Sequence, residues 1–89
     1  MYSTASCPFC RSAERLFERK GVLDLERVRV DLSPERRAEM VRKSGRGTVP
    51  QIWINGIHVG GCDDLYALED TGELDRLLAQ AAGAPQTAG

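Results

Sequence analysis

The stretch Cys7-Pro8-Phe9-Cys10, near the amino terminus, places two cysteines three positions apart at a predicted helix start. Pro8 suits the first position of a helix, where the missing N–H costs nothing. From Cys10 onward, apolar or small residues recur at helical spacing until Gly21, a residue type that often ends helices. We therefore expect a helix that is capped by Cys7, contains Cys10 in its first turn and ends near Gly21.

Two cysteines at this spacing are typical of redox chemistry or of metal binding. The nucleophile in thiol–disulfide exchange is the thiolate, and a free cysteine with a pKa of about 8.5 is mostly protonated at neutral pH. A helix start favours a negatively charged sulfur, because unpaired backbone N–H groups and the helix dipole face it. Cys7 is therefore predicted to be the attacking thiol. Cys10 is predicted to be the resolving thiol, which attacks the same sulfur to release a mixed disulfide.

Two other interpretations of the cysteines stay open. Cys7, Cys10, His58 and Cys62 could together supply the four ligands of a zinc site. Against zinc, residues 11–20 continue as a helix and His58 falls within a predicted strand. Alternatively, the paired cysteines could be small buried apolar residues.

Composition describes one small soluble domain. The chain has 89 residues, of which 42% are apolar and 28% are charged, and a chain this short has room for one core. Its 12 Lys and Arg against 13 Asp and Glu lack the basic excess that nucleic-acid binding requires. No segment approaches the roughly 18 consecutive apolar residues of a membrane helix, and no secretory leader pattern is present. We expect a cytoplasmic, monomeric domain over residues 1–82, with a disordered tail at residues 83–89.

The segment that follows the first predicted helix has the alternating pattern of a strand. In residues 25–32, Val28, Val30 and Leu32 lie on one side and charged residues lie on the other. Residues 1–4 leave room for only a short first strand.

A second helix is predicted after this strand. Ser33 is a suitable N-cap, Pro34 suits the first helical position, and the helix should stop before Gly45. Its predicted apolar stripe consists of Ala38, Met40 and Val41.

An antiparallel hairpin and a final helix complete the chain. Residues 51–54 and 57–59 flank Asn55-Gly56, a dipeptide that tolerates the positive φ angles of a two-residue turn. We interpret Trp53 and His58 as hairpin residues without a ligand role. The last helix is expected to be capped by Cys62 or Asp63 and to break near Gly72.

Three motifs taken together resemble those of bacterial dithiol glutaredoxins. They are, in chain order, Cys7-Pro8-Phe9-Cys10, Thr48-Val49-Pro50-Gln51-Ile52 and Gly60-Gly61-Cys62-Asp63-Asp64-Leu65. The likeness runs from residue 1 to about residue 79. It implies an α/β thioredoxin-like fold, in which a central four-stranded mixed sheet is flanked by helices on both faces. It also implies that Pro50 follows a cis peptide bond, a geometry that is rare outside proline.

The resemblance further implies a site for glutathione as cosubstrate, with no metal. The backbone of Val49 would pair with the cysteinyl part of glutathione like an added strand. The γ-glutamyl carboxylate would lie at the helix start formed by Cys62 and Asp63, and Asp63 would also meet the amino group. Phe9 would pack against the ligand and Arg46 would meet a carboxylate. The residues expected to contact glutathione are Phe9, Arg46, Thr48, Val49, Pro50, Gly61, Cys62 and Asp63.

By the same resemblance, the expected activity is reduction of protein–glutathione mixed disulfides and protein disulfides. An alternative within the fold is a carrier in which two chains use Cys7 and two glutathiones to hold a [2Fe–2S] centre. Pro8 argues against this carrier, because cluster-binding relatives tend to have a smaller residue there. The chain also departs from the family pattern at Thr4, where relatives usually carry a lysine.

Overall fold

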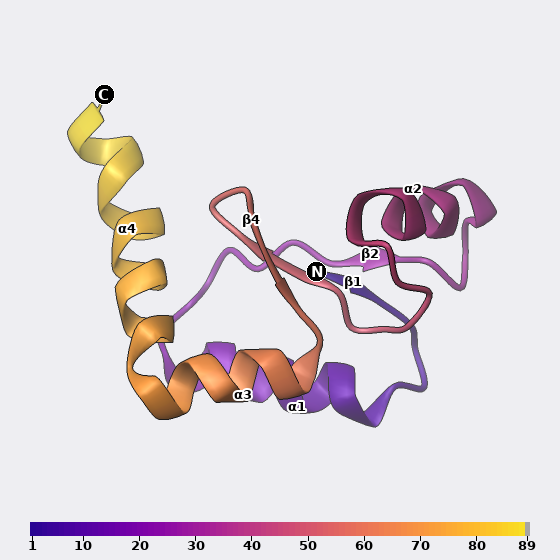
Figure 1. Cartoon of the computed structure of the whole chain (residues 1–89), viewed down its shortest axis with the longest axis horizontal. Helices are drawn as coiled ribbons and strands as arrows, with labels where there is room; N and C mark the ends of the chain where they lie inside the picture. The colour runs from indigo at the N-terminus through magenta and orange to yellow at the C-terminus, as the bar shows by residue number, and fades with distance from the viewer. Residues whose placement is uncertain (89) are drawn as a thin grey trace.

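The computed structural model describes the backbone of residues 1–88 and the side chains of residues 1–80. A thin layer of strands lies at the centre, with α2 on one side and with α1 and α3 on the other (Figure 1). The elements are β1 Tyr2–Ser3, α1 Pro8–Arg19, β2 Val28–Arg29, α2 Pro34–Ser44, β3 Ile52–Ile54, β4 Ile57–Gly60, α3 Cys62–Thr71 and α4 Glu73–Ala88. This is the predicted order of helices and strands.

The four strands form two short ladders that one bridge connects. β1 pairs in parallel with β2, and β3 pairs antiparallel with β4. Tyr2 and Gln51 exchange backbone hydrogen bonds of 2.9 and 3.2 Å in an antiparallel bridge, which joins β1 to the start of β3. The spatial order is therefore β2-β1-β3-β4, the mixed arrangement of strands that was expected.

Alternate residues of the central strands pack on opposite sides of this layer. Tyr2 belongs to a cluster with Met40 of α2, and Trp53 packs against that cluster. Ile52 and Ile54 belong to the larger cluster on the side of α1 and α3. The buried members of this larger cluster are Met1, Ala13, Leu16, Phe17, Ile52, Ile54, Leu65 and Leu74. Side chains of β3 thus enter both cores, as the period of two in a strand requires.

Helix α1 confirms the prediction made from the first motif. Cys7 is the N-cap in extended conformation and Pro8 is the first helical residue. The buried face consists of Cys10, Ala13, Leu16 and Phe17. Because this face is anchored against the larger core, the position of the Cys7 backbone is fixed by packing of the whole helix.

The strand predicted over residues 25–32 is much shorter in the structure. Only Val28–Arg29 forms β2, since its partner β1 offers two residues for pairing. Val30 is buried as expected, but Leu32 is 72% exposed. The chain turns before Leu32, whose N–H donates to the carbonyl of Arg29, so the alternation ends before Leu32 reaches the core.

Helix α2 has the predicted ends but not the predicted stripe. Ser33 Oγ accepts the Arg36 N–H at 3.3 Å, and Gly45 ends the helix with a φ of 74°. Met40 is fully buried, whereas Ala38 and Val41 are exposed. The stripe prediction is wrong for these two residues because α2 contributes a single buried side chain to the smaller core.

The turn of the hairpin and the helix break agree with the sequence. Asn55 and Gly56 have φ angles of 51° and 79°, and Gly72 separates α3 from α4 with a φ of 81°. Helix α4 extends to Ala88 and thus through part of the segment predicted to be a tail. Because the side chains of that segment and all of Gly89 lie outside the described residues, the domain boundary at residue 82 stays a prediction. No described helix is long and apolar enough to span a membrane.

Candidate active site

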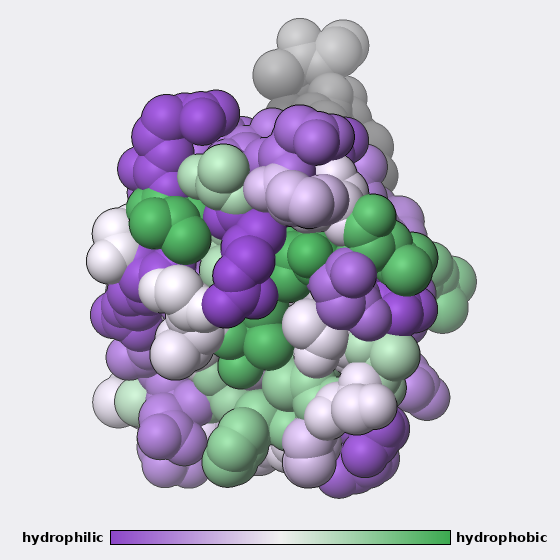
Figure 2. Space-filling view, turned by 90° about the vertical axis from the view of Figure 1, so that its right-hand side faces the viewer, coloured by the Kyte–Doolittle hydropathy of each residue, from purple (hydrophilic) through white to green (hydrophobic). Residues whose placement is uncertain are grey.

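A small cavity brings the second and third motifs together beside the start of α1. Its volume is about 210 Å³, and it is lined by Phe9, Arg46, Thr48, Val49, Pro50, Gly61, Cys62, Asp63 and Asp64. All eight residues that were expected to contact a ligand are among these nine. Figure 2 views the molecule from the side of α2 and of the start of α1, and shows hydrophobic side chains in the middle of this face.

The Cys7 sulfur lies between two backbone groups. Its Sγ accepts the Cys10 N–H at 3.1 Å, which is the capping bond of α1. Its thiol also lies 3.8 Å from the carbonyl oxygen of Val49, within reach of a weak S–H donation. If the thiol ionises, the bond from Cys10 N–H remains and stabilises the negative sulfur. The sulfur is therefore held between the helix start and the loop that lines the cavity.

Cys10 has a different environment from that of Cys7. Its side chain is only 2% exposed, on the buried face of α1. Burial, followed by the hydrogen bond with Cys7, raises the pKa of Cys10 to about 12. At neutral pH Cys10 is thus a neutral thiol. None of the three cysteines, all of which are buried, forms a disulfide bond in this structure.

The Thr48-Val49-Pro50 loop forms one wall of the cavity. The Val49–Pro50 peptide bond is cis, as the family resemblance implied. Pro50 is buried, and the carbonyl of Val49 faces the Cys7 sulfur. Phe9 also lines the cavity and is 61% exposed, so its apolar ring can cover a bound molecule.

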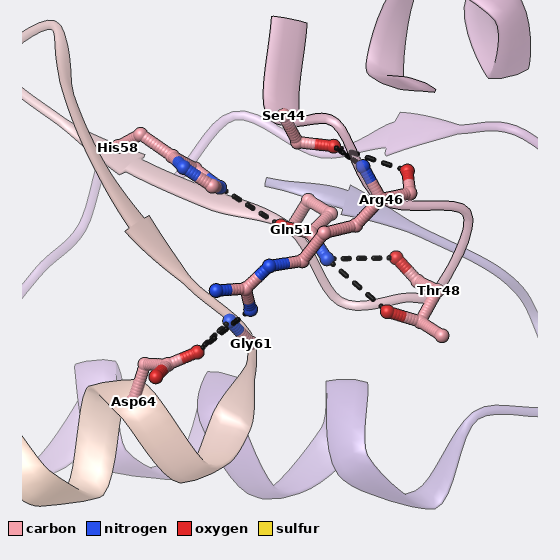
Figure 3. Close-up of polar contacts among 7 residues, drawn as sticks. All are labelled: Ser44, Arg46, Thr48, Gln51, His58, Gly61 and Asp64. Carbon is pink, nitrogen blue, oxygen red and sulfur yellow. Dashed lines mark hydrogen bonds and ion pairs between the residues drawn. The ribbon is translucent and has the colours of Figure 1, made fainter.

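An ion pair between Arg46 and Asp64 lies at the cavity (Figure 3). Arg46 Nη1 is 2.9 Å from Asp64 Oδ2, and the same oxygen accepts the Gly61 N–H at 2.9 Å. The Gly61 N–H, and then the Arg46 guanidinium, lower the pKa of Asp64. Asp64 therefore stays ionised at neutral pH and connects the start of α3 to the loop after α2.

The cap of α3 differs from the prediction, and Asp64 was missed as a site residue. The N-cap is Gly61, not Cys62 or Asp63. A carboxylate at the third helical position that accepts the N-cap N–H is half of a capping box. The position of Asp64, three residues after Gly61, could therefore have identified this helix start from the sequence. The sequence prediction missed Asp64 because it placed the cap at Cys62 or Asp63, one or two residues after the true N-cap.

The described side chains do not assemble the zinc set that the sequence left open. His58 Nε2 lies 2.9 Å from Gln51 Oε1, and its ring stacks on Trp53 at 4.5 Å. Over the described part of the chain, no group of three or more His, Cys, Asp or Glu side chains is arranged to hold a metal ion. His58 is therefore engaged within the hairpin.

Replacing Asp64 by asparagine tests its role at this helix start. We expect a loss of about 0.3–1 kcal/mol in the free energy of unfolding at pH 7, because a charge near the helix N-terminus and the bond to Gly61 are weakened. The folded-state pKa of Asp64 is lowered, so this stability is present above the unfolded pKa of about 3.9 and is lost as pH falls through the folded value. Urea unfolding of wild type and variant from pH 7 to pH 3 should show the difference closing below about pH 4. The control is Asp63→Asn at the adjacent exposed position, and an equal loss there would contradict the assignment.

Sequence and structure comparisons give consistent matches. A sequence model of the glutaredoxin family, described as "Glutaredoxin", matches residues 1–59. A glutaredoxin of Pseudomonas aeruginosa is 57% identical over 79 residues, covering 89% of this chain and 93% of that protein. The solution structure of a Brucella melitensis glutaredoxin aligns with a TM-score of 0.75 and 53% identity, over 86% of this chain and 83% of that one. The crystal structure of a buckwheat glutaredoxin–glutathione complex aligns with a TM-score of 0.84 and 26% identity, over 91% and 76%.

The fold and the paired cysteines at a helix start define a protein of the thioredoxin-like class with a redox function. Within that class, the chain belongs to the glutaredoxin family.

Proposed function

We propose that the chain is a glutathione-dependent thiol–disulfide oxidoreductase that reduces protein–glutathione mixed disulfides and protein disulfides. The observation that carries this proposal is the cavity beside the Cys7–Val49 contact, whose lining includes the basic Arg46 and the acidic Asp63 and Asp64. Such a cavity suits a small charged peptide that carries both an amino group and carboxylates and has a sulfur on its central residue. Family membership and the buckwheat complex with glutathione support this ligand.

In the proposed binding mode, the ligand runs along the Thr48–Pro50 loop toward the start of α3. The exposed edge of Val49 pairs with the cysteinyl part, which brings its sulfur toward Cys7. The first turn of α3 receives the γ-glutamyl carboxylate at the backbone of Cys62 and Asp63. The Asp63 carboxylate is suited to the γ-glutamyl amino group and Arg46 to a carboxylate, so the ligand would compete with the ion pair between Arg46 and Asp64.

The proposed reaction proceeds through a covalent intermediate on Cys7. The Cys7 thiolate attacks the glutathione sulfur of a mixed disulfide, a Cys7–glutathione disulfide forms, and the protein thiolate leaves and takes up a proton. A second glutathione thiolate then attacks the bound glutathione sulfur, which releases oxidised glutathione and regenerates the Cys7 thiolate. Overall, one free glutathione is consumed and one molecule of oxidised glutathione is released for each mixed disulfide reduced.

Protein disulfides follow a second route in this proposal. After Cys7 attacks such a disulfide, Cys10 loses its proton and attacks the Cys7 sulfur, which releases the second protein thiol. The product is a Cys7–Cys10 disulfide, which two glutathiones reduce. A monomer in the cytoplasm, where glutathione is abundant, suits both routes.

Mass and absorption measurements on the purified protein test the proposal against the metal-binding alternatives. We expect oxidised glutathione to lower the intact mass of the reduced protein by two hydrogens, as the Cys7–Cys10 disulfide forms. A retained zinc mass would instead support a zinc module, and visible charge-transfer bands would support a [2Fe–2S] carrier. Either of these results, with no change on oxidation, would contradict the proposal.

A further inference from the structure

Gln51, which directly follows Pro50, carries a polar side chain that is completely buried. Its Nε2 donates to the carbonyl of Thr48 at 3.1 Å and lies 3.2 Å from Thr48 Oγ1 (Figure 3). Because a carbonyl only accepts hydrogen bonds, the NH₂ end of the amide must face Thr48 and Oε1 must face the other way. The side chain of Gln51 thus clamps both acceptors of the residue that begins the cavity loop.

The other end of the Gln51 amide is held by His58. His58 Nε2 lies 2.9 Å from Gln51 Oε1, and since Oε1 is an acceptor, Nε2 must carry the hydrogen. The imidazole is itself fixed by stacking on Trp53, with ring centroids 4.5 Å apart and planes 34° apart. The series of contacts therefore runs from Trp53 through His58 and Gln51 to Thr48.

This series ends one residue from the proposed catalytic contact. Thr48 precedes Val49, whose carbonyl faces the Cys7 sulfur at 3.8 Å and whose backbone is the proposed pairing edge for the ligand. Thr48 is itself exposed, so the buried Gln51 amide ties this exposed loop to the interior of the hairpin. The carbonyl of Thr48 and the N–H of Val49 belong to one planar peptide unit, so a shift of that carbonyl would move the Val49 N–H with it.

We propose that Gln51 and His58 are positioning residues, which hold the Thr48–Val49 peptide in the orientation that binds glutathione beside Cys7. This inference rests on the proposed function and adds to it two residues that do not line the cavity. The hydrogen bonds from His58 to Gln51 and from Gln51 to Thr48 can be tested without measuring activity. A competing explanation is that the pair merely fills the hairpin and satisfies its own polar groups.

Three variants distinguish a positioning role for Gln51 and His58 from a role that only fills the interior of the hairpin. Gln51→Met removes the clamp on Thr48, and His58→Phe keeps a ring on Trp53 but removes the donor to Gln51. The double variant replaces both partners by apolar side chains of similar size, so no buried polar group is left unpaired. We expect each single variant to melt at a lower temperature, and the double variant to recover much of that loss. In contrast, we expect KM for a glutathionylated peptide to rise by about tenfold in Gln51→Met and to stay raised in the double variant, with a smaller change in kcat.

A control variant that is destabilised elsewhere shows whether the rise in KM comes from loss of the contact between Gln51 and Thr48. Ile54→Val shortens a core side chain of β3, the strand that follows Gln51, and should lower the melting temperature while leaving KM unchanged. Recovery of KM together with stability in the double variant would overturn the proposal, as would a raised KM in Ile54→Val. If wild type itself fails to reduce the glutathionylated peptide, the proposed function is wrong.

An NMR measurement tests the hydrogen-bonded series without any turnover. Imidazole ¹⁵N–¹H spectra of neutral His58 should show the hydrogen on Nε2 in wild type. In Gln51→Met this preference should weaken, and the amide signals of Thr48 and Val49 should shift. A hydrogen on Nδ1 in wild type, or unchanged loop signals in the variant, would overturn the positioning role whatever the activity proves to be.

Discussion

Replacing Cys7 by serine is expected to lower the reduction of both a glutathionylated peptide and a protein disulfide by at least about 100-fold, because a hydroxyl cannot form the disulfide intermediate. Replacing Cys10 should leave reduction of the glutathionylated peptide largely intact. In that reaction a second glutathione, not the internal thiol, attacks the Cys7–glutathione disulfide. Turnover of the protein disulfide should fall in the Cys10 variant, since release of the second thiol then depends on glutathione from solution.

The position of Cys10 on the buried face of α1 decides how this comparison is controlled. A serine hydroxyl there is buried without an assured partner and can destabilise the fold. Cys10→Ala, which replaces the thiol by a small apolar group, should therefore be measured beside Cys10→Ser. Thermal unfolding of all variants shows whether activity was lost with the fold. Equal loss of peptide reduction in folded Cys7 and Cys10 variants would show that the two roles are assigned wrongly.

The two thiols of the first motif should differ by at least about 100-fold in their rates of alkylation by iodoacetamide at pH 8. Burial raises the pKa of Cys10 to about 12, so only about one Cys10 in ten thousand is a thiolate at that pH. Since the pKa is raised, the neutral thiol persists from acid through neutral pH, and the thiolate appears only as pH rises toward 12. Cys7, at the helix start, should be labelled first.

Peptide mapping by mass spectrometry after short labelling times measures this difference. Denaturation in guanidinium chloride is the control, because unfolding exposes Cys10 and should remove the selectivity. Labelling of Cys10 in the folded protein as fast as Cys7 would contradict the buried, protonated state of the resolving thiol.

Local signals in the sequence identified the elements that position the site. The start of α1 depends on Pro8 and on helical spacing of the residues after Cys10, and both act within a few positions. The hairpin turn depends on Asn55 and Gly56, two residue types that tolerate positive φ. These features were predictable because neighbouring residues alone decide them.

The features that sequence reasoning missed depend on partners far along the chain. Residues 25–32 alternate like a long strand, yet β2 is limited to two residues by the length of β1. Val41 was assigned to a core face, but α2 buries Met40 alone. Pairing length and helix contact area follow from the assembled fold, which a local pattern does not contain.

The residues in and around the cavity also differ in whether neighbouring residues or distant contacts reveal them. Seven of the eight lining residues that were predicted belong to the family motifs, and the eighth, Arg46, lies two positions before the second motif. The sequence alone does not reveal a role for His58 and Gln51. Their contact joins positions seven residues apart across the hairpin, and the direction of each side chain is visible only in the structure.

Mass spectrometry of the Cys10→Ser variant tests the central claim, attack by Cys7 on a glutathione mixed disulfide, most directly. The variant is mixed with an excess of glutathionylated peptide and no free glutathione, then digested and mapped. We predict a mass increase of one glutathione on the peptide that contains Cys7, together with release of the reduced peptide. Release without an adduct on Cys7, or an adduct on Cys62 alone, would contradict the account.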